Sequence, residues 1–232
     1  MRRSSGMHLP SELEFGSFLQ YAPRGTTNVS RSSKTVCSAI KNDFQISIRS
    51  ADGKASFVWA IQKAVERIEQ TRPKFPLLDT FFGPDRILIP VPRSAPFRVS
   101  DALWPARRIC DELVARGLGA AVMPALIRHT AVTKSATAPK GCRPMPPDHF
   151  RSTSLASELP LFSQKKITIV DDVITRGSTF IGMSPHVAAA FPDHDIRCFA
   201  LVRTISVGDV ETLEAPAAGS IEYSGNYLHR EP

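Results

Sequence analysis

Two adjacent carboxylates and a short hydroxyl-rich turn follow an apolar run in the second half of the chain. The apolar run is residues 167 to 170, and the carboxylates are Asp171 and Asp172. The turn consists of Thr175, Arg176, Gly177, Ser178 and Thr179. Two ionised carboxylates are strongly unfavourable in a dry interior, so we expect them to face solvent, hydroxyl groups or cations. Backbone N–H groups and hydroxyls at the start of a helix are typical of a phosphate site. The stretch therefore joins groups that can hold hydroxyls to groups that can hold a phosphate.

This stretch resembles the phosphoribosyl pyrophosphate (PRPP) binding motif of the type I phosphoribosyltransferases, an apolar strand followed by Asp-Asp-Val-x-Thr-x-Gly-x-Thr. The resemblance covers thirteen consecutive positions, Ile167 to Thr179. It implies that Asp171 and Asp172 are the catalytic-site residues that hold the ribose hydroxyls, and that residues 175 to 179 cradle the 5-phosphate. It also implies Mg²⁺ that is bound with PRPP and has no direct protein ligand. The alternative is an ordinary strand-to-helix turn with capping residues, which does not explain two tandem carboxylates.

A wider similarity, over residues 86 to 204, is to the ComF branch of that family, named for competence proteins involved in DNA uptake. The segments that carry it, in order, are Ile89-Pro90-Val91-Pro92-Arg93, a helix, Leu126-Ile127-Arg128-His129, a basic loop, and Asp148-His149-Phe150. In related enzymes the turn after the first strand contacts pyrophosphate, which implies that role for Pro92, Arg93 and Ser94. A solvated arginine at a strand end explains Arg93 equally well. The four-cysteine zinc module with which ComF relatives often begin is not matched, because residues 1 to 80 contain only Cys37.

A long basic loop lies between the second and third predicted core strands. Residues 128 to 151 contain several prolines and little hydrophobic periodicity, and a loop of this length in a compact domain is usually functional or mobile. Lys134, Lys140 or Arg143 could close over the site and supply a cation to pyrophosphate. For any one of the three, a solvated positive surface is the competing interpretation.

Short apolar runs alternate with helical stripes in the segment from residue 81 to residue 206. The predicted strands are 86–91, 120–127, 167–170 and 196–202, and the predicted helices are 103–114 and one that begins near residue 178. This order predicts an α/β fold whose mainly parallel sheet is flanked by helices. The resemblance makes it a type I phosphoribosyltransferase-like, Rossmann-like core. Ligands of open α/β sheets bind outside the carboxyl ends of the strands, where Asp171 and Asp172 would emerge.

Two segments flank this core. Residues 1–80 are an added N-terminal segment, which would act as a hood, the part outside the core that holds the acceptor in related enzymes. Residues 207–232 are a C-terminal tail. In the first, we expect a loop over residues 22–35, a strand over 44–48 and a helix from Phe57 to Ile68. In the tail, residues 220–223 are predicted to add an edge strand. Residues 226–232 are expected to be frayed or packed onto a partner.

The composition is that of an ordinary globular protein. Of the 232 residues, 42% are hydrophobic and 22% charged, so the chain can bury a core and is not globally disordered. No apolar run approaches the length of a membrane span, and no export signal is apparent. Four widely separated cysteines without a C-x-x-C pair suggest reduced thiols. We therefore expect a soluble, cytoplasmic protein with no membrane partner.

Two functional hypotheses follow. The first is an enzyme that transfers the phosphoribosyl group of PRPP to an unidentified acceptor with release of pyrophosphate. The second is a non-catalytic ComF-like protein that acts in DNA uptake, nucleic-acid handling or PRPP-sensing regulation. The net charge of +7 admits nucleic acid as a partner, whereas the aromatic content of 8% argues mildly against a single-strand binding platform. Whether the chain forms a homodimer is left open.

Overall fold

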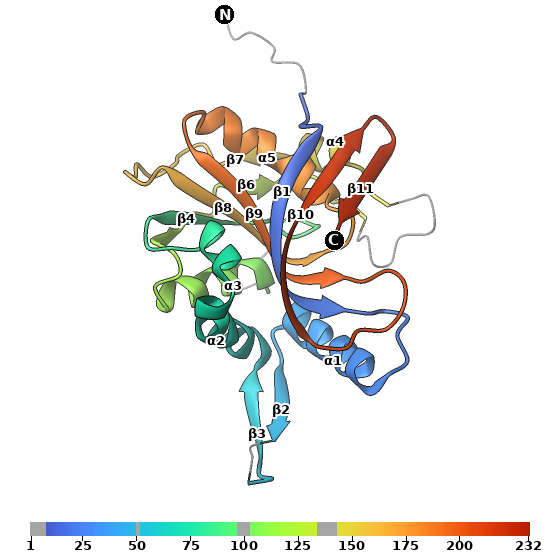
Figure 1. The fold of residues 1–232 in the computed structure, drawn as a ribbon. Helices are drawn as coiled ribbons and strands as arrows, with labels where there is room; N and C mark the ends of the chain where they lie inside the picture. Colours follow the sequence, from blue (N-terminus) through green and yellow to red (C-terminus); the bar gives the residue numbers. More distant parts are fainter. Residues whose placement is uncertain (1–7, 50–51, 97–102, 134–142) are drawn as a thin grey trace, which may run out of the picture.

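The computed structural model describes residues 8–49, 52–96, 103–133 and 143–232, and its centre is one seven-stranded sheet (Figure 1). The strand order is β11-β10-β1-β9-β8-β4-β5. Five neighbouring strands are parallel: β1 (Glu12–Tyr21), β9 (Asp195–Thr204), β8 (Lys166–Ile174), β4 (Arg86–Pro90) and β5 (Ala121–Val122). The other two, β10 (Glu214–Ser224) and β11 (Tyr227–Glu231), extend the sheet antiparallel to β1. The prediction of an α/β fold with a mainly parallel sheet is confirmed.

Helices flank the sheet. One face is covered by α1 (Asn28–Asn42), α2 (Ala60–Thr71) and α3 (Pro105–Ala115), with two short 3₁₀ helices at Arg72–Lys74 and Pro76–Thr80. The other face is covered mainly by α5 (Ser178–Ala190), against which the short α4 (Pro146–Arg151) packs. Along the central strands, neighbouring residues bury their side chains in opposite cores, for example Ile169 and Val170. Burial on both faces explains why these strands are almost continuously apolar in sequence.

The predicted core strands at 86–91, 167–170 and 196–202 are confirmed as β4, β8 and β9, and the two core helices as α3 and α5. The predicted strand at 120–127 is wrong as a single element. Its first part is β5, whereas its last part begins β6 (Leu126–Arg128), which pairs with β7 (Thr153–Leu155) in a separate ribbon. Pro124 lies between them and has no N–H group with which to continue a ladder.

The N-terminal segment differs most from expectation. The loop predicted over residues 22–35 is wrong, because α1 begins at Asn28. The Thr27 side chain caps this helix by accepting a hydrogen bond from the Ser30 N–H at 3.2 Å. The many serines in this segment suggested a loop, but the segment is a helix whose Cys37 and Ile40 side chains are buried. The predicted strand at 44–48 is confirmed as β2 (Gln45–Arg49). Phe57, however, belongs to its partner β3 (Ala55–Trp59), and the helix starts only at Ala60.

Strand β1 was not anticipated, although it lies between β9 and β10 in the sheet. Its sequence contains Gly16 and Ser17, which weaken a strand signal. Gly16 is required by packing, because a Cβ atom there would lie 2.5 Å from the Phe81 ring. The predicted strand at residues 220–223 is confirmed within β10, but its predicted place at the edge is wrong, because β10 lies between β1 and β11. The expectation that residues 226–232 are frayed is wrong, because β11 occupies the edge of the sheet. Packing of these residues onto a partner stays a prediction. The three predicted segments thus contribute to one sheet.

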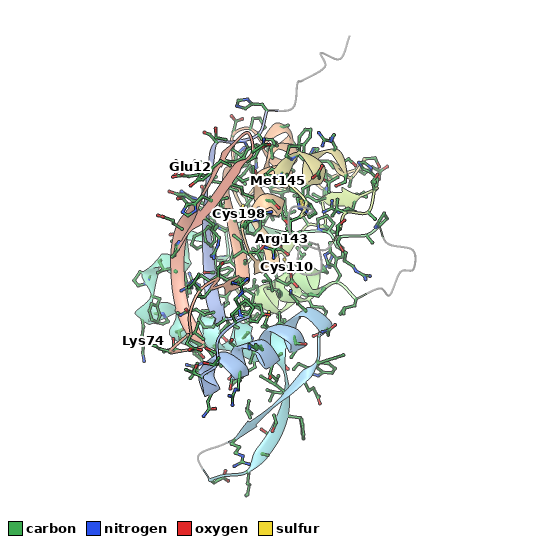
Figure 2. All side chains as sticks on the ribbon, turned by 90° about the vertical axis from the view of Figure 1, so that its right-hand side faces the viewer. Glu12, Lys74, Cys110, Arg143, Met145 and Cys198 are labelled. Carbon is green, nitrogen blue, oxygen red and sulfur yellow. The ribbon has the colours of Figure 1, made fainter. Side chains whose placement is uncertain are left out.

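Three cysteines, Cys37, Cys110 and Cys198, are free thiols in the interior, and Figure 2 shows the latter two within the body of the protein. Burial raises the pKa of Cys37 to about 11 and also raises the pKa values of the other two. Cys142 lies outside the described residues. Among the described residues, no helix is long and apolar enough to cross a membrane.

Candidate functional site

A cleft of about 580 Å³ opens at the carboxyl ends of β4 and β8. It is lined by nine of the residues singled out from the sequence: Pro92, Arg93, Ser94, Asp171, Asp172, Thr175, Gly177, Ser178 and Thr179. Residues from two segments about eighty positions apart meet here because Pro90 and Val170 are paired neighbours on parallel strands. The location agrees with the general rule for ligand sites in open α/β sheets.

The two aspartates are half-buried side chains of β8 at this cleft. The Asp172 N–H donates to Asp171 Oδ1 at 2.8 Å, and the Val173 N–H donates to Asp172 Oδ1 at 2.8 Å. No ion pair within the described part of the chain includes either carboxylate, although Arg128 is close enough for its charge to interact with that of Asp171. Burial, followed by the charge of Asp172, raises the pKa of Asp171 well above its usual range, and the nearby Lys41 partly opposes this shift. The acids are thus placed to accept hydrogen bonds from a ligand.

The turn between β8 and α5 depends on Gly177. This residue has a φ of +86° and precedes the first residue of α5. A Cβ atom there would lie 2.6 Å from the Ile221 side chain of β10. Glycine is therefore required both by its left-handed backbone and by close packing. The Ser178 hydroxyl donates to the Pro144 carbonyl at 3.0 Å, so this hydroxyl is committed to the protein. The Thr175 and Thr179 hydroxyls have no hydrogen-bond partner within the described residues.

Arg176 is the one member of the predicted phosphate cradle that does not line the cleft. Burial and the neighbouring charge of Arg143 lower its pKa, which places these two predicted residues near each other. Two guanidinium groups that repel each other beside the turn add positive potential there. Lys134 and Lys140 lie outside the described residues.

The turn after β4 is held from several sides. The Val91 N–H donates to Val170 O at 2.8 Å, and the Trp104 indole N–H donates to Val91 O at 2.7 Å. Beyond it, the Val132 N–H donates to Ser94 O at 2.8 Å. These bonds give Pro92, Arg93 and Ser94 a defined position next to the aspartates.

Arg128 and His149 also line the cleft, although no site role was assigned to them from the sequence. Both are buried, and Arg128 donates to the Arg93 carbonyl at 2.9 Å and to the Ser152 hydroxyl. Its Nη2 lies 3.4 Å from His149 Nδ1. Because a guanidinium only donates, His149 Nδ1 is the acceptor and the ring proton is on Nε2, which is buried without a partner among the described residues. Burial and the charge of Arg128 lower the pKa of His149 to about 4, so the ring is neutral at pH 7.

Lys41 and Asn42, at the end of α1, line the cleft opposite the core strands. They were missed because the start of α1 was predicted as a loop. The signal that was available was the Thr27 cap followed by buried positions at helical spacing, Ser30, Ser33, Cys37 and Ile40. The N-terminal segment therefore forms one wall of the cleft.

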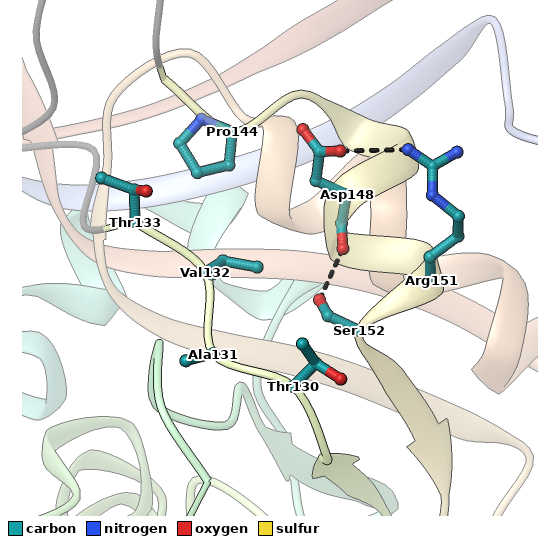
Figure 3. Close-up of a pocket in the computed structure, with 8 residues that line it drawn as sticks. All are labelled: Thr130, Ala131, Val132, Thr133, Pro144, Asp148, Arg151 and Ser152. Atoms are coloured by element: carbon teal, nitrogen blue, oxygen red, sulfur yellow. Dashed lines mark hydrogen bonds and ion pairs between the residues drawn. The ribbon is translucent and has the colours of Figure 1, made fainter.

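A second cavity, of about 340 Å³, lies between residues 130–133 and α4 (Figure 3). Figure 3 shows the ion pair between Asp148 and Arg151, whose Oδ1 and Nη2 atoms are 3.0 Å apart, at its rim. Val132 and Thr133 line both cavities, which are therefore neighbours.

No protein-family model matches the chain, and no curated protein matches it either. Within the described residues, no group of three or more histidine, cysteine or acidic side chains is arranged to hold a metal ion.

Proposed function

We propose that the cleft binds PRPP and that the protein is a type I phosphoribosyltransferase-like enzyme that transfers the phosphoribosyl group to an acceptor. The observation that carries the proposal is the meeting of the two aspartates, the β8–α5 turn and residues 92–94 around one cleft. An ordinary capped turn accounts for none of the other groups that line it. We also propose that the α/β fold is of the type I phosphoribosyltransferase kind.

Each wall of the cleft suits one part of PRPP. The backbone N–H groups of the turn and the hydroxyls of Thr175 and Thr179 would hold the 5-phosphate. Asp171 and Asp172, which have no ion-pair partner among the described residues, would accept hydrogen bonds from the ribose hydroxyls. Residues 92–94 would contact pyrophosphate, and Lys41 and Asn42, which line the same cleft, would contact the acceptor.

The reaction needs position and charge rather than a covalent intermediate. The acceptor's nucleophilic atom forms a bond to the anomeric carbon while the carbon–oxygen bond to pyrophosphate breaks. Pyrophosphate leaves with the electron pair, and the acceptor's proton passes to solvent. The cleft fixes the sugar so that the nucleophile meets the carbon in line. Magnesium bound with PRPP would supply positive charge to the leaving group.

Binding is tested by thermal unfolding with PRPP and Mg²⁺. We expect millimolar PRPP to raise the Tm of the wild type by several degrees, because a ligand that binds only the folded state stabilises it. The double variant Asp171→Asn/Asp172→Asn should show no rise. Asp111→Asn, a matched change on the exposed side of α3 where Asp111 pairs with Arg107, should respond as the wild type does.

An absent PRPP shift in the wild type would contradict the proposal. Salt-sensitive DNA binding that survives the two Asn changes, without any PRPP shift, would instead support the non-catalytic interpretation. If PRPP binds, pyrophosphate release with a panel of nucleobases and amines would identify the acceptor. PRPP binding without pyrophosphate release for any acceptor would favour a PRPP sensor.

A further inference from the structure

Two arginines on the α5 side of the sheet have no acidic partner in the part of the chain that the structure describes. Arg203 lies near the end of β9 and is only 7% exposed, and Arg230 lies in β11. Neither forms an ion pair with any acidic side chain in the described ranges. Buried charges in folded proteins are almost always paired, because an isolated buried charge is poorly solvated.

The hydrogen bonds of this pair are incomplete. Arg203 Nη1 donates to Ser17 Oγ at 3.2 Å and to the Ala215 carbonyl, but Arg203 Nε is buried with no partner in the described ranges. Arg230 Nη2 donates to the Thr204 carbonyl at 2.6 Å, while Arg230 Nε and Nη1 are buried and have no partner within the described residues. The Thr204 hydroxyl is likewise buried and unpartnered. Within the described residues, three guanidinium nitrogen atoms, which carry four N–H groups, and one hydroxyl are therefore buried without a hydrogen-bond partner.

The two guanidinium groups are close to each other. Arg230 donates to the residue that follows Arg203, and its guanidinium carbon lies 5.6 Å from the centre of the Phe15 ring. Burial and, as the smaller cause, the charge of Arg203 together lower the pKa of Arg230 to about 10. Both groups remain charged at pH 7. Two neighbouring guanidinium groups with buried, unpartnered N–H groups are an arrangement that can recognise an oxyanion.

We propose that Arg203, Arg230 and the Thr204 hydroxyl form a second anion site, separate from the cleft, that binds one small inorganic oxyanion of the phosphate or sulfate class. None of these residues lines the cleft. A small, unsubstituted anion is favoured because the unpartnered donors are buried, which leaves no path for a bulky substituent.

The second anion site adjoins the β8–α5 turn. Arg203 pairs with Ile174, the residue before Thr175. Arg230 pairs with Ile221, whose side chain packs against Gly177. An anion bound at the second anion site would reduce the repulsion between the Arg203 and Arg230 guanidinium groups next to the β8–α5 turn. It would thereby stabilise the backbone of this turn, which forms one wall of the cleft.

The test compares sulfate with gluconate at equal ionic strength, in thermal unfolding and in titration calorimetry. Sulfate should raise the Tm of the wild type, and Arg230→Lys, which keeps the charge but loses the guanidinium donors, should bind sulfate at least about tenfold more weakly. Thr179→Val, altered in the β8–α5 turn, should keep the wild-type affinity at the second anion site. This separates the proposal from sulfate that binds in the cleft.

Arg230→Met provides an independent measurement. In gluconate it should unfold at a higher temperature than the wild type, because the repulsion between two buried cations is removed, and sulfate should narrow or reverse this difference. Equal sulfate stabilisation of the wild type, Arg230→Lys and Arg230→Met would overturn the proposal. So would the absence of any difference between sulfate and gluconate in the wild type.

Discussion

Replacing Gly177 with alanine should destabilise the protein by about 2–5 kcal/mol, from two separate causes. The φ of +86° places an alanine in the left-handed region, at a cost of roughly 1–2 kcal/mol. The new Cβ would also lie 2.6–2.8 Å from three carbon atoms of Ile221, which is far inside contact distance. Relieving such an overlap typically costs about 1–3 kcal/mol.

Gly208 is a matched control, because it has the same φ of +86° and nothing within 4 Å of the position a Cβ would take. Gly208→Ala should therefore pay only the backbone cost. In urea unfolding followed by circular dichroism, we expect the midpoint to fall further for Gly177→Ala than for Gly208→Ala, with unchanged m-values. Equal losses at the two positions would refute the packing argument.

A double-mutant cycle with Ile221→Ala isolates the contact. Ile221→Ala alone should cost about 2–5 kcal/mol, since Ile221 is fully buried. Combined with Gly177→Ala, the total loss should be smaller than the sum of the single losses by about 1–3 kcal/mol, because the overlapping atoms are gone. Strict additivity would show that the two side chains do not meet.

Three further changes test other parts of the site and core. Asp171→Asn should stabilise the unliganded protein at pH 7 by on the order of 1 kcal/mol. Because the pKa of Asp171 is raised on folding, stability falls as pH rises above 3.8, and the advantage of the variant in urea unfolding should vanish below that pH. The pH dependence due to His149 has the opposite sign. Because folding lowers the pKa of His149 from 6.5 to about 4, the free energy of unfolding of the wild type should fall by about 3 kcal/mol as the pH falls from 6.5 to 4. His149→Asn should lose correspondingly less between the same two pH values, and parallel pH profiles would contradict the assignment. Thr168→Val should cost about 1–2 kcal/mol, since the buried hydroxyl donates to the Phe81 carbonyl at 2.7 Å; an unchanged urea midpoint would show that this bond contributes nothing.

Local patterns were sufficient for the elements whose residues are apolar on both faces. Strands β4, β8 and β9 and helices α3 and α5 could be predicted because each buries a continuous run or a complete stripe. Strand β1 could not, because Gly16 is required by close packing against Phe81 rather than by local preference. Helix α1 was missed although its Thr27 cap and helical spacing were readable, because several of its buried positions are serines. The split at Pro124 was readable in principle, since proline ends a ladder.

The sequence by itself determined the contiguous part of the site: two acids at the end of a strand and a glycine turn before a helix, because consecutive residues share one local geometry. Only the tertiary structure decided what surrounds them. The pairing of β4 with β8 brought residues 92–94 to the aspartates, and α1 supplied Lys41 and Asn42. The approach of Arg203 to Arg230 likewise depends on how β9 and β11 lie in the folded sheet. Contacts between residues distant in the chain follow from packing, which no local pattern encodes.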